Sequence, residues 1–202
     1  MTDLAESLRI QRISGSAIQA WLPVLAQLRI RVFREFPYLY DGSVAYEEKY
    51  LHSYVAVPDS VMVLAQDGER VVGAASGLPL VAETPNVIAP FLQHGYDPRR
   101  IFYYGESVLL PEYRGRGLGH RFLAEREAHA RALGGFEMVC FCAVVRPIEH
   151  PRRPADYRPL DMLWNRHGFV RHPELHTIFS WQDLDEATES PKPMVFWLKR
   201  LD

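Results

Sequence analysis

The chain has 202 residues, of which 48% are hydrophobic and 24% are charged, as in an ordinary soluble globular protein that can bury a sizeable core. Its 23 Lys and Arg residues nearly balance 25 Asp and Glu residues, which argues against nucleic acid or an anionic membrane as the main partner. Because the composition does not change between the two halves of the chain, we expect one domain over residues 1–202. The sequence has no long apolar window and no signal-peptide pattern, so we expect the protein in the cytoplasm.

The N-terminal part of the chain predicts a strand followed by two helices. Apolar side chains alternate over residues 7–13, as in a β-strand. Over residues 17–36 they recur every three or four positions, which predicts an amphipathic helix whose arginines, Arg29 among them, fall mostly on the solvent side. Proline, glycine and aromatic residues at 36–42 end this helix, and a second short helix is predicted at 44–54.

A hairpin and a long insertion follow. Residues 61–66 and 70–78 read as two strands joined by Asp67-Gly68, a dipeptide that tolerates the positive φ of a tight turn. Residues 79–100 then interrupt the sheet with several prolines. Because long irregular connections in compact domains often serve function, we expect this insertion to act either as a specificity lid or as an oligomer contact in a homodimer.

Residues 101–133 read as a strand, a glycine-rich turn and a helix, and the chain is organised around this unit. A helix N-terminus presents unpaired N–H groups and a partial positive charge, which suits an anion. Glycines let a ligand approach the backbone, and arginines add donors for phosphate oxygens. The glycines are Gly115, Gly117 and Gly119, and the arginines are Arg114, Arg116 and Arg121. The turn therefore predicts a diphosphate site.

The C-terminal part begins with a buried strand. Residues 137–145 are nearly all apolar, and Cys140 and Cys142 would face the same side as buried, reduced thiols. Residues 146–159 hold four arginines among four prolines and read either as a solvated loop or as an electrostatic rim for an anion. A helix is predicted at 160–167, and antiparallel strands at 174–183 and 194–201.

The glycine spacing separates three known motifs. G-x-G-x-G matches neither the Walker A loop, which ends in Gly-Lys-Ser/Thr, nor the dinucleotide fingerprint G-x-G-x-x-G. Arg114-x-x-Gly117-x-Gly119 resembles the acyl-CoA motif of the GNAT superfamily of N-acyltransferases, and residues 163–169 (LWNRHGF) resemble that family's later aromatic-x-x-x-Gly-Phe signature. The resemblance covers residues 101–170. It implies an α/β (α+β) fold with a mixed, twisted central sheet of about seven strands and helices on both faces.

By this resemblance we expect an N-acetyltransferase that moves an acetyl group from acetyl-CoA directly to an amine of a small molecule or peptide, in a ternary complex. Acetyl-CoA is then a cosubstrate. No metal is expected, since the histidines show no H-E-x-x-H or similar spacing. Two alternatives stay open: a protein of the same fold that binds acyl-CoA with little turnover, and transfer of a longer acyl chain or transfer to a hydroxyl.

The resemblance also implies where the coenzyme binds. Backbone groups after the central glutamate would pair with the pantetheine arm like an added strand, and N–H groups at the start of the helix would hold the diphosphate. Asn165 and Trp164 would flank the thioester arm or the adenine. The expected coenzyme-binding residues are Val108, Leu109, Leu110, Arg114, Gly115, Arg116, Gly117, Leu118, Gly119, His120 and Asn165.

Glu106 is the first candidate for the general base. An alkyl ammonium has a pKa of about 10 and must lose a proton before it attacks. Relatives in the family often carry an acidic residue at this place on the central strand, facing the acceptor. The alternative for Glu106 is a salt bridge to a neighbouring arginine. Asp41, Glu47 and Glu48 are weaker candidates, since solvated charges at helix ends explain them.

A proton donor for the departing thiolate is less clear from the sequence. The family commonly has a tyrosine at the position that Trp164 occupies here, and an indole N–H does not deliver a proton usefully. Tyr157 is the favoured substitute, ahead of Cys142 and His167. Alternatively the thiolate leaves unaided, because a thiol with a pKa of about 8.5 is a tolerable leaving group.

The aromatic turn, residues 36–42, is the expected acceptor side of the site. Phe36, Tyr38 and Tyr40 either plug the edge of the core or, as this connection does in the GNAT family, line the acceptor pocket together with Glu106.

Overall fold

The structure, a computed structural model, describes residues 8–201. Its elements in chain order, where η is a 3-10 turn, are β1 (Leu8–Ile13), η1 (Gly15–Trp21), α1 (Leu22–Phe33), α2 (Val44–Ala56), β2 (Val61–Asp67), β3 (Arg70–Pro79), η2 (Leu80–Ala82), α3 (Pro85–Gln93), η3 (Pro98–Arg100), β4 (Ile101–Tyr103), β5 (Ser107–Leu109), η4 (Pro111–Tyr113), α4 (Leu118–Leu133), β6 (Met138–Val144), α5 (Asp161–Arg166), β7 (Val170–Trp181) and β8 (Ser190–Arg200). None of the helices in this part of the chain is long and apolar enough to cross a bilayer.

Eight strands in the described residues form one mixed sheet in the order β1-β2-β3-β4-β6-β8-β7, and β5 also pairs with β3. β4 and β6 run parallel, and the other neighbours are antiparallel. The predicted mixed sheet is confirmed, with one strand more than expected. The extra strand arises because residues 101–110, predicted as one strand, form β4 and β5, separated by Tyr104, Gly105 and Glu106.

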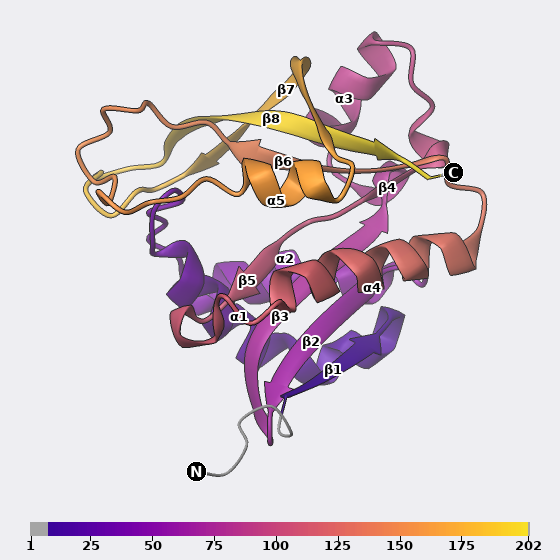
Figure 1. The fold of residues 1–202 in the computed structure, drawn as a ribbon, viewed down its shortest axis with the longest axis horizontal. Helices are drawn as coiled ribbons and strands as arrows, with labels where there is room; N and C mark the ends of the chain where they lie inside the picture. Colours follow the sequence, from indigo (N-terminus) through magenta and orange to yellow (C-terminus); the bar gives the residue numbers. More distant parts are fainter. Residues whose placement is uncertain (1–7, 202) are drawn as a thin grey trace.

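Helices cover both faces of the sheet, as predicted. In Figure 1, α4 and α5 lie in front of the sheet, and α1 and α2 lie behind it. The larger hydrophobic cluster joins the sheet to α1, α2 and α4. A second cluster joins β4, β6 and β8 to α3. Figure 1 also shows β5 and β6 running apart from the point where β4 ends, so the two halves of the sheet diverge there.

The α-helix predicted at 17–36 is shorter in the structure, where it covers Leu22–Phe33. Residues 15–21 form a 3-10 turn, and α1 begins at Leu22 with Pro23 in its first turn, where a missing N–H costs nothing. The prediction that Arg29 faces solvent is wrong, because its side chain is buried between two carboxylates, those of Glu47 and Glu106. Glu47 is fully buried as well, so the interpretation of Glu47 as a solvated charge is also wrong.

The insertion at 79–100 is ordered around α3, which packs on β7 and β8. The side-chain amide of Asn86 donates to the carbonyl of Ile178 (3.2 Å), and the hydroxyl of Thr177 donates to the carbonyl of Asn86 (2.6 Å). The rings of Phe91 and Phe196 are 4.8 Å apart. The insertion therefore covers the face of β6 that carries Cys140 and Cys142, which are both buried and unbonded to each other, as predicted.

Candidate functional site

The β5 strand leaves one backbone edge open. The N–H of Leu110 donates to the carbonyl of Val72 (3.0 Å), and the N–H of Ser76 donates to the carbonyl of Glu106 (3.0 Å). In an antiparallel pair, residues with inward and outward backbone groups alternate. The backbone groups of residues 106, 108 and 110 are therefore committed to β3.

Ser107 and Leu109 point their backbone groups away from β3, toward the side where β6 diverges. Among the described strands, β5 pairs with β3 alone. Of the residues expected to bind the pantetheine arm, Leu109 thus has backbone groups on this open edge of β5, whereas Val108 and Leu110 do not. Ser107, which the sequence analysis did not select, joins Leu109 there.

A buried arginine builds the irregular segment between β4 and β5. Arg126 of α4 donates from Nη1 to the carbonyls of Ser76 and Glu106 (3.1 Å each) and from Nη2 to Oγ of Ser107 (2.8 Å). It is 2% exposed, and burial lowers its pKa to about 10. Gly105 is required, because a Cβ there would collide with the hydroxyls of Tyr54 and Ser76.

Sequence reasoning did not select Arg126, although a signal was present. Arg126 lies four residues after Phe122 and eight after Leu118, on the apolar face of the predicted helix. A charged residue at such a position needs buried partners. In this structure the partners are the carbonyls of Ser76 and Glu106 and the hydroxyl of Ser107.

The glycine-rich turn leads into α4 as predicted. Gly115 and Gly117 have positive φ angles of 73° and 79°, and a Cβ at either position would meet no atom within 4 Å. The first intrahelical bond shown at this end runs from the N–H of Arg121 to the carbonyl of Gly117 (3.2 Å). The N–H groups of Leu118, Gly119 and His120 precede it and are free for an anion.

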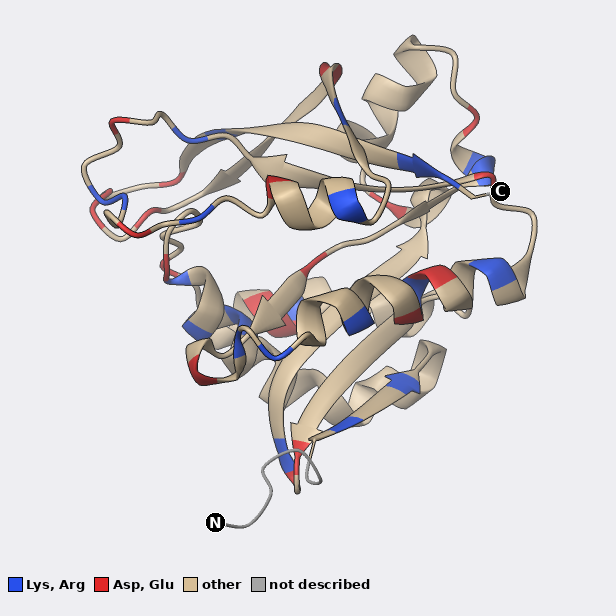
Figure 2. Ribbon diagram, viewed as in Figure 1, with Lys and Arg blue, Asp and Glu red and all other residues tan. Residues whose placement is uncertain are grey.

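The arginines of the turn already have partners. Arg114 donates to the carbonyl of Leu109 from Nε and Nη2 (3.2 Å each), and its Nη1 lies 2.8 Å from Oε2 of Glu35. Arg116 donates to the carbonyl of Glu112 (2.9 Å). In Figure 2, the loop before α4 carries blue segments, which mark Lys and Arg residues. Arg114 thus lies between the open edge of β5 and the turn.

Two histidines connect α4 with the end of α5. Nδ1 of His120 lies 2.7 Å from Nε2 of His167. Partial burial and the neighbouring His120 lower the pKa of His167. Asn165 is exposed on α5. Trp164 packs instead on Phe141 and Trp197 at ring distances of 4.9 and 5.0 Å, so its indole contributes to the core.

Glu106 lies on the opposite face of the sheet, toward α1 and α2. Its side chain is 5% exposed, and Nη1 of Arg29 lies 2.8 Å from Oε2. The hydroxyl of Tyr50 donates to the same oxygen (3.2 Å). The salt bridge that the sequence left open is therefore present. Oε1 of Glu106 has no hydrogen-bond partner within residues 8–201, so one carboxylate oxygen remains available.

The buried Arg29 joins Glu106 to Glu47. Burial alone would lower the pKa of Arg29, but its electrostatic interactions with Glu106, Tyr50 and Glu47 outweigh burial and raise the pKa. Since one cation serves two carboxylates, this group carries a net negative charge. A cationic acceptor would be attracted to it.

The aromatic turn is fixed by a second buried ion pair. Arg146 donates to the carbonyls of Pro37 (2.7 Å) and Tyr38 (2.8 Å), and it pairs with both carboxylate oxygens of Asp183 at 2.8 and 2.9 Å. Lys192 is also paired with Asp183 (3.3 Å). Arg146 is therefore neither a solvated residue nor a free rim cation, because its donors hold residues 37 and 38 in place.

The aromatic candidates divide between two places. The ring of Tyr38 lies 4.6 Å from that of Phe33 and 5.8 Å from that of Trp181, and burial raises the pKa of Tyr38 above its ordinary range. The rings of Phe36 and Tyr157 meet edge-on at 4.7 Å. The ring of Tyr40 lies instead 6.4 Å from that of Tyr46 of α2, and burial, followed by Glu47, raises the pKa of Tyr40.

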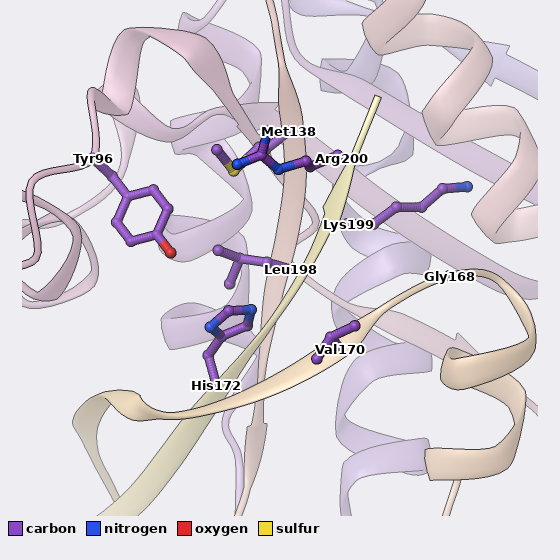
Figure 3. A pocket seen from close by; sticks show the side chains of 8 residues that line it. All are labelled: Tyr96, Met138, Gly168, Val170, His172, Leu198, Lys199 and Arg200. Carbon is purple, nitrogen blue, oxygen red and sulfur yellow. The ribbon is translucent and has the colours of Figure 1, made fainter. Parts of the chain in front are cut away.

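A separate pocket of about 350 Å³ lies at the far end of the sheet (Figure 3). It is lined by Tyr96, Met138, Gly168, Val170, His172, Leu198, Lys199 and Arg200. Lys199 points away from it in Figure 3 and pairs with Glu127 of α4 (2.5 Å). The lining includes none of the predicted site residues.

Within residues 8–201, no group of three or more His, Cys, Asp or Glu side chains is arranged to hold a metal ion. The described residues thus offer a helix N-terminus for an anion, an open strand edge beside it, and a negatively charged group on the opposite face of the sheet.

The family comparison agrees with the sequence motifs. The model of the "Acetyltransferase (GNAT) family" matches residues 26–154. No curated protein matches the chain.

Solved structures share the fold over nearly the whole chain. A putative acetyltransferase, yncA, from Salmonella typhimurium with its cofactor acetyl-CoA is 12% identical, with a TM-score of 0.61 and coverage of 97% of this chain and 95% of that one. The ribosomal-protein-alanine N-acetyltransferase from Brucella melitensis is 17% identical, with a TM-score of 0.61 and coverage of 96% and 99%. Arabidopsis thaliana NAA60 in complex with a bisubstrate analogue is 13% identical, with a TM-score of 0.60 and coverage of 96% and 100%.

Proposed function

Since the GNAT model matches residues 26–154, the chain belongs to the GNAT family of acetyltransferases, and we propose that it transfers an acetyl group from acetyl-CoA directly to an amine of a small molecule or peptide. The observation that supports the proposal is the open edge of β5. One end of β5 follows Glu106, and the other end leads through the glycine-rich turn to the first N–H groups of α4.

In this proposal the diphosphate of acetyl-CoA binds at the start of α4. The N–H groups of Leu118, Gly119 and His120 donate to it, and Gly115 and Gly117 leave room for its oxygens. The pantetheine arm lies along Ser107 and Leu109 like an added strand. An amide of the arm that donates to the carbonyl of Leu109 replaces Arg114 there, and the freed guanidinium can turn to a phosphate oxygen.

The acceptor amine is placed at Oε1 of Glu106, the oxygen that Arg29 and Tyr50 leave available. Oε1 of Glu106 takes one proton from the ammonium, and the nitrogen then attacks the thioester carbon with its lone pair. The N–H of Ser107, on the open edge of β5, is placed to donate to the oxygen that becomes negative in the tetrahedral intermediate. The C–S bond then breaks, the thiolate of CoA leaves with the electron pair, and the added nitrogen gives its second proton to the thiolate or to solvent.

A Glu106→Gln variant tests the acceptor side. We expect kcat/KM to fall by about 10²-fold, the lower end for loss of a group that handles the proton, while the affinity for CoA stays unchanged. Thiol release with acetyl-CoA and a panel of primary amines measures kcat/KM, and thermal stabilisation by CoA measures the affinity for CoA. Glu48→Gln on the same helix as Tyr50 is the control. CoA-dependent stabilisation of the wild-type protein without thiol release for any amine would refute the proposed activity.

A Tyr157→Phe variant tests the proposed proton donor. It keeps the ring that packs on Phe36 and removes only the hydroxyl. Because a thiol of pKa about 8.5 leaves fairly well without help, we expect kcat to fall by only about 10-fold. Tyr46→Phe, at an exposed tyrosine, should leave kcat unchanged. If both variants turn over like the wild type, Tyr157 has no such role.

A further inference from the structure

Ser107 combines an exposed side chain with backbone groups on the open edge of β5. Its Oγ accepts a hydrogen bond from Nη2 of Arg126 at 2.8 Å. Within residues 8–201, the hydroxyl makes no other hydrogen bond. A guanidinium group can only donate, so the proton of the Ser107 hydroxyl does not point at Arg126 and is available to a molecule that lies along the open edge.

Arg126 is a buried cation whose contacts in the described part of the chain are all with uncharged groups. Nε donates to the carbonyl of Phe122 (3.2 Å), and Nη1 donates to the carbonyls of Ser76 and Glu106 (3.1 Å each). The guanidinium carbon lies 4.2 Å from the centre of the Tyr104 ring. These contacts satisfy the N–H donors but do not neutralise the charge. A buried charge of this kind stabilises a negative charge that develops next to it.

The two buried arginines give the two sides of the segment between β4 and β5 opposite charges. On the side of α1 and α2, Arg29 is shared by two carboxylates, which leaves a net negative charge. On the side of α4, which lies across the sheet in Figure 1, Arg126 has no carboxylate partner among the described residues. The proposed reaction needs both charges, because a cationic amine approaches from one side and the thioester oxygen becomes negative on the other.

We propose that the hydroxyl of Ser107, oriented and polarised by Arg126, donates a hydrogen bond to the thioester oxygen of acetyl-CoA, as a second donor beside the N–H of the same residue. This inference rests on the proposed function. Ser107 is then a catalytic residue, and Arg126 is a positioning residue that acts through it.

The hydroxyl transfers no proton in this step. When the amine attacks, the π electrons of the C=O bond move to the oxygen, and the two hydrogen bonds and the buried cation stabilise the negative charge. When the C–S bond breaks, the oxygen returns this electron pair to the C=O bond. Because the hydrogen bond strengthens as the charge develops, the hydroxyl raises kcat more than it raises the affinity for acetyl-CoA.

A Ser107→Ala variant removes the hydroxyl and keeps the N–H. With acetyl-CoA and the primary amine that gives the fastest thiol release, we expect kcat to fall by about 10²-fold, as for the loss of one donor to such an oxygen. The KM for acetyl-CoA should stay unchanged. Ser107→Thr keeps a hydroxyl and should turn over nearly as fast as the wild type. Ser180→Ala, at an exposed serine of β7, is the control and should have the wild-type kcat.

Infrared difference spectroscopy tests the hydrogen bond without an acceptor. Acetyl-CoA that is isotope-labelled at the thioester carbon shows the stretching band of the bound C=O group, and a hydrogen-bond donor lowers the frequency of this band. We expect a higher frequency in Ser107→Ala than in the wild type, and the wild-type frequency in Ser107→Thr and Ser180→Ala. A hydroxyl that only satisfies Arg126 would leave the band unchanged in Ser107→Ala.

An Arg126→Lys variant tests the positioning role. Lysine keeps the positive charge but lacks the planar group that binds the two carbonyls and the hydroxyl together, so kcat should fall. Since part of this loss passes through the hydroxyl, the double variant Ser107→Ala/Arg126→Lys should lose less than the product of the two single losses. A loss equal to the product would mean that Arg126 does not act through Ser107. If Arg126→Lys does not fold, the Ser107 variants alone decide the proposal.

The outcomes separate the two proposals. An active wild type whose kcat is unchanged in Ser107→Ala overturns the role of the hydroxyl and leaves the proposed function standing. A lower kcat in Ser107→Ala without a shift of the C=O band likewise overturns it. A wild type that binds acetyl-CoA but releases no thiol with any amine overturns the proposed function, and the catalytic role of Ser107 falls with it.

Discussion

A Gly117→Asp variant is expected to bind CoA at least about 10²-fold more weakly than the wild type. Gly117 precedes α4 with a φ of 79°, and the space where its Cβ would stand is empty. An aspartate there places a carboxylate against the N–H groups proposed to hold the diphosphate. Like charges brought together at a binding site cost several kcal/mol, and about 1.4 kcal/mol corresponds to tenfold in affinity. Titration calorimetry with CoA measures the loss.

A matched control separates this effect from backbone strain. Any L-residue at a positive φ of this kind costs roughly 1–2 kcal/mol of stability. Gly134, at the other end of α4, is equally free of neighbours and has a φ of 74° and a ψ of 171°, which L-residues adopt less readily than the left-handed conformation of Gly117. Gly134→Asp therefore carries at least as much strain, far from the proposed diphosphate site. It should bind CoA as the wild type does. Equal CoA affinity in both variants would place the diphosphate somewhere other than the start of α4.

The strand, turn and helix around Gly117 could be predicted because their signals are local. An apolar run, three closely spaced glycines and a helical apolar repeat lie within 33 residues, 101–133. The hairpin at Asp67-Gly68 and the buried cysteines were predictable for the same reason. Each of these features depends on residues that are close in the sequence, so a short stretch of sequence is enough to predict it.

The buried charges could not be predicted in this way, because their partners are distant in the sequence. Arg29 pairs with residues 18 and 77 positions away. Its place four residues after Leu25 and seven after Leu22 sets it on the apolar face of the helix, but the sequence does not show which carboxylates would pair with it there.

The same distance explains why the split of the central strand was missed. The carbonyls that Arg126 binds belong to Ser76 and Glu106, 50 and 20 residues away. The apolar pattern over residues 101–110 predicts one continuous strand, because it contains no sign of the buried guanidinium group that binds the backbone there. The split is what frees Ser107 and Leu109 for the coenzyme in the proposed mechanism, so this part of the site depends on tertiary contacts.

An Arg29→Met variant is expected to lose about 3–5 kcal/mol of stability, the usual cost of removing one partner from a buried ion pair. Glu47 and Glu106, whose side chains are 0% and 5% exposed, would be left without a cation. Because a buried, unpaired carboxylate is favoured in its protonated form, the loss should shrink as the pH falls. Urea unfolding at several pH values measures it.

Arg31→Met provides the control on the same helix. Arg31 pairs with Glu112 at 3.6 Å, and both side chains are about half exposed, so its loss should cost less than about 1 kcal/mol. The double variant Arg29→Met/Glu47→Gln should be more stable than Arg29→Met, since it removes one of the two buried carboxylates that have lost their cation. CoA should still bind to the folded Arg29→Met protein, because the proposed diphosphate site lies on the opposite face of the sheet. An Arg29→Met variant as stable as Arg31→Met would mean that this cation does not hold the two carboxylates together.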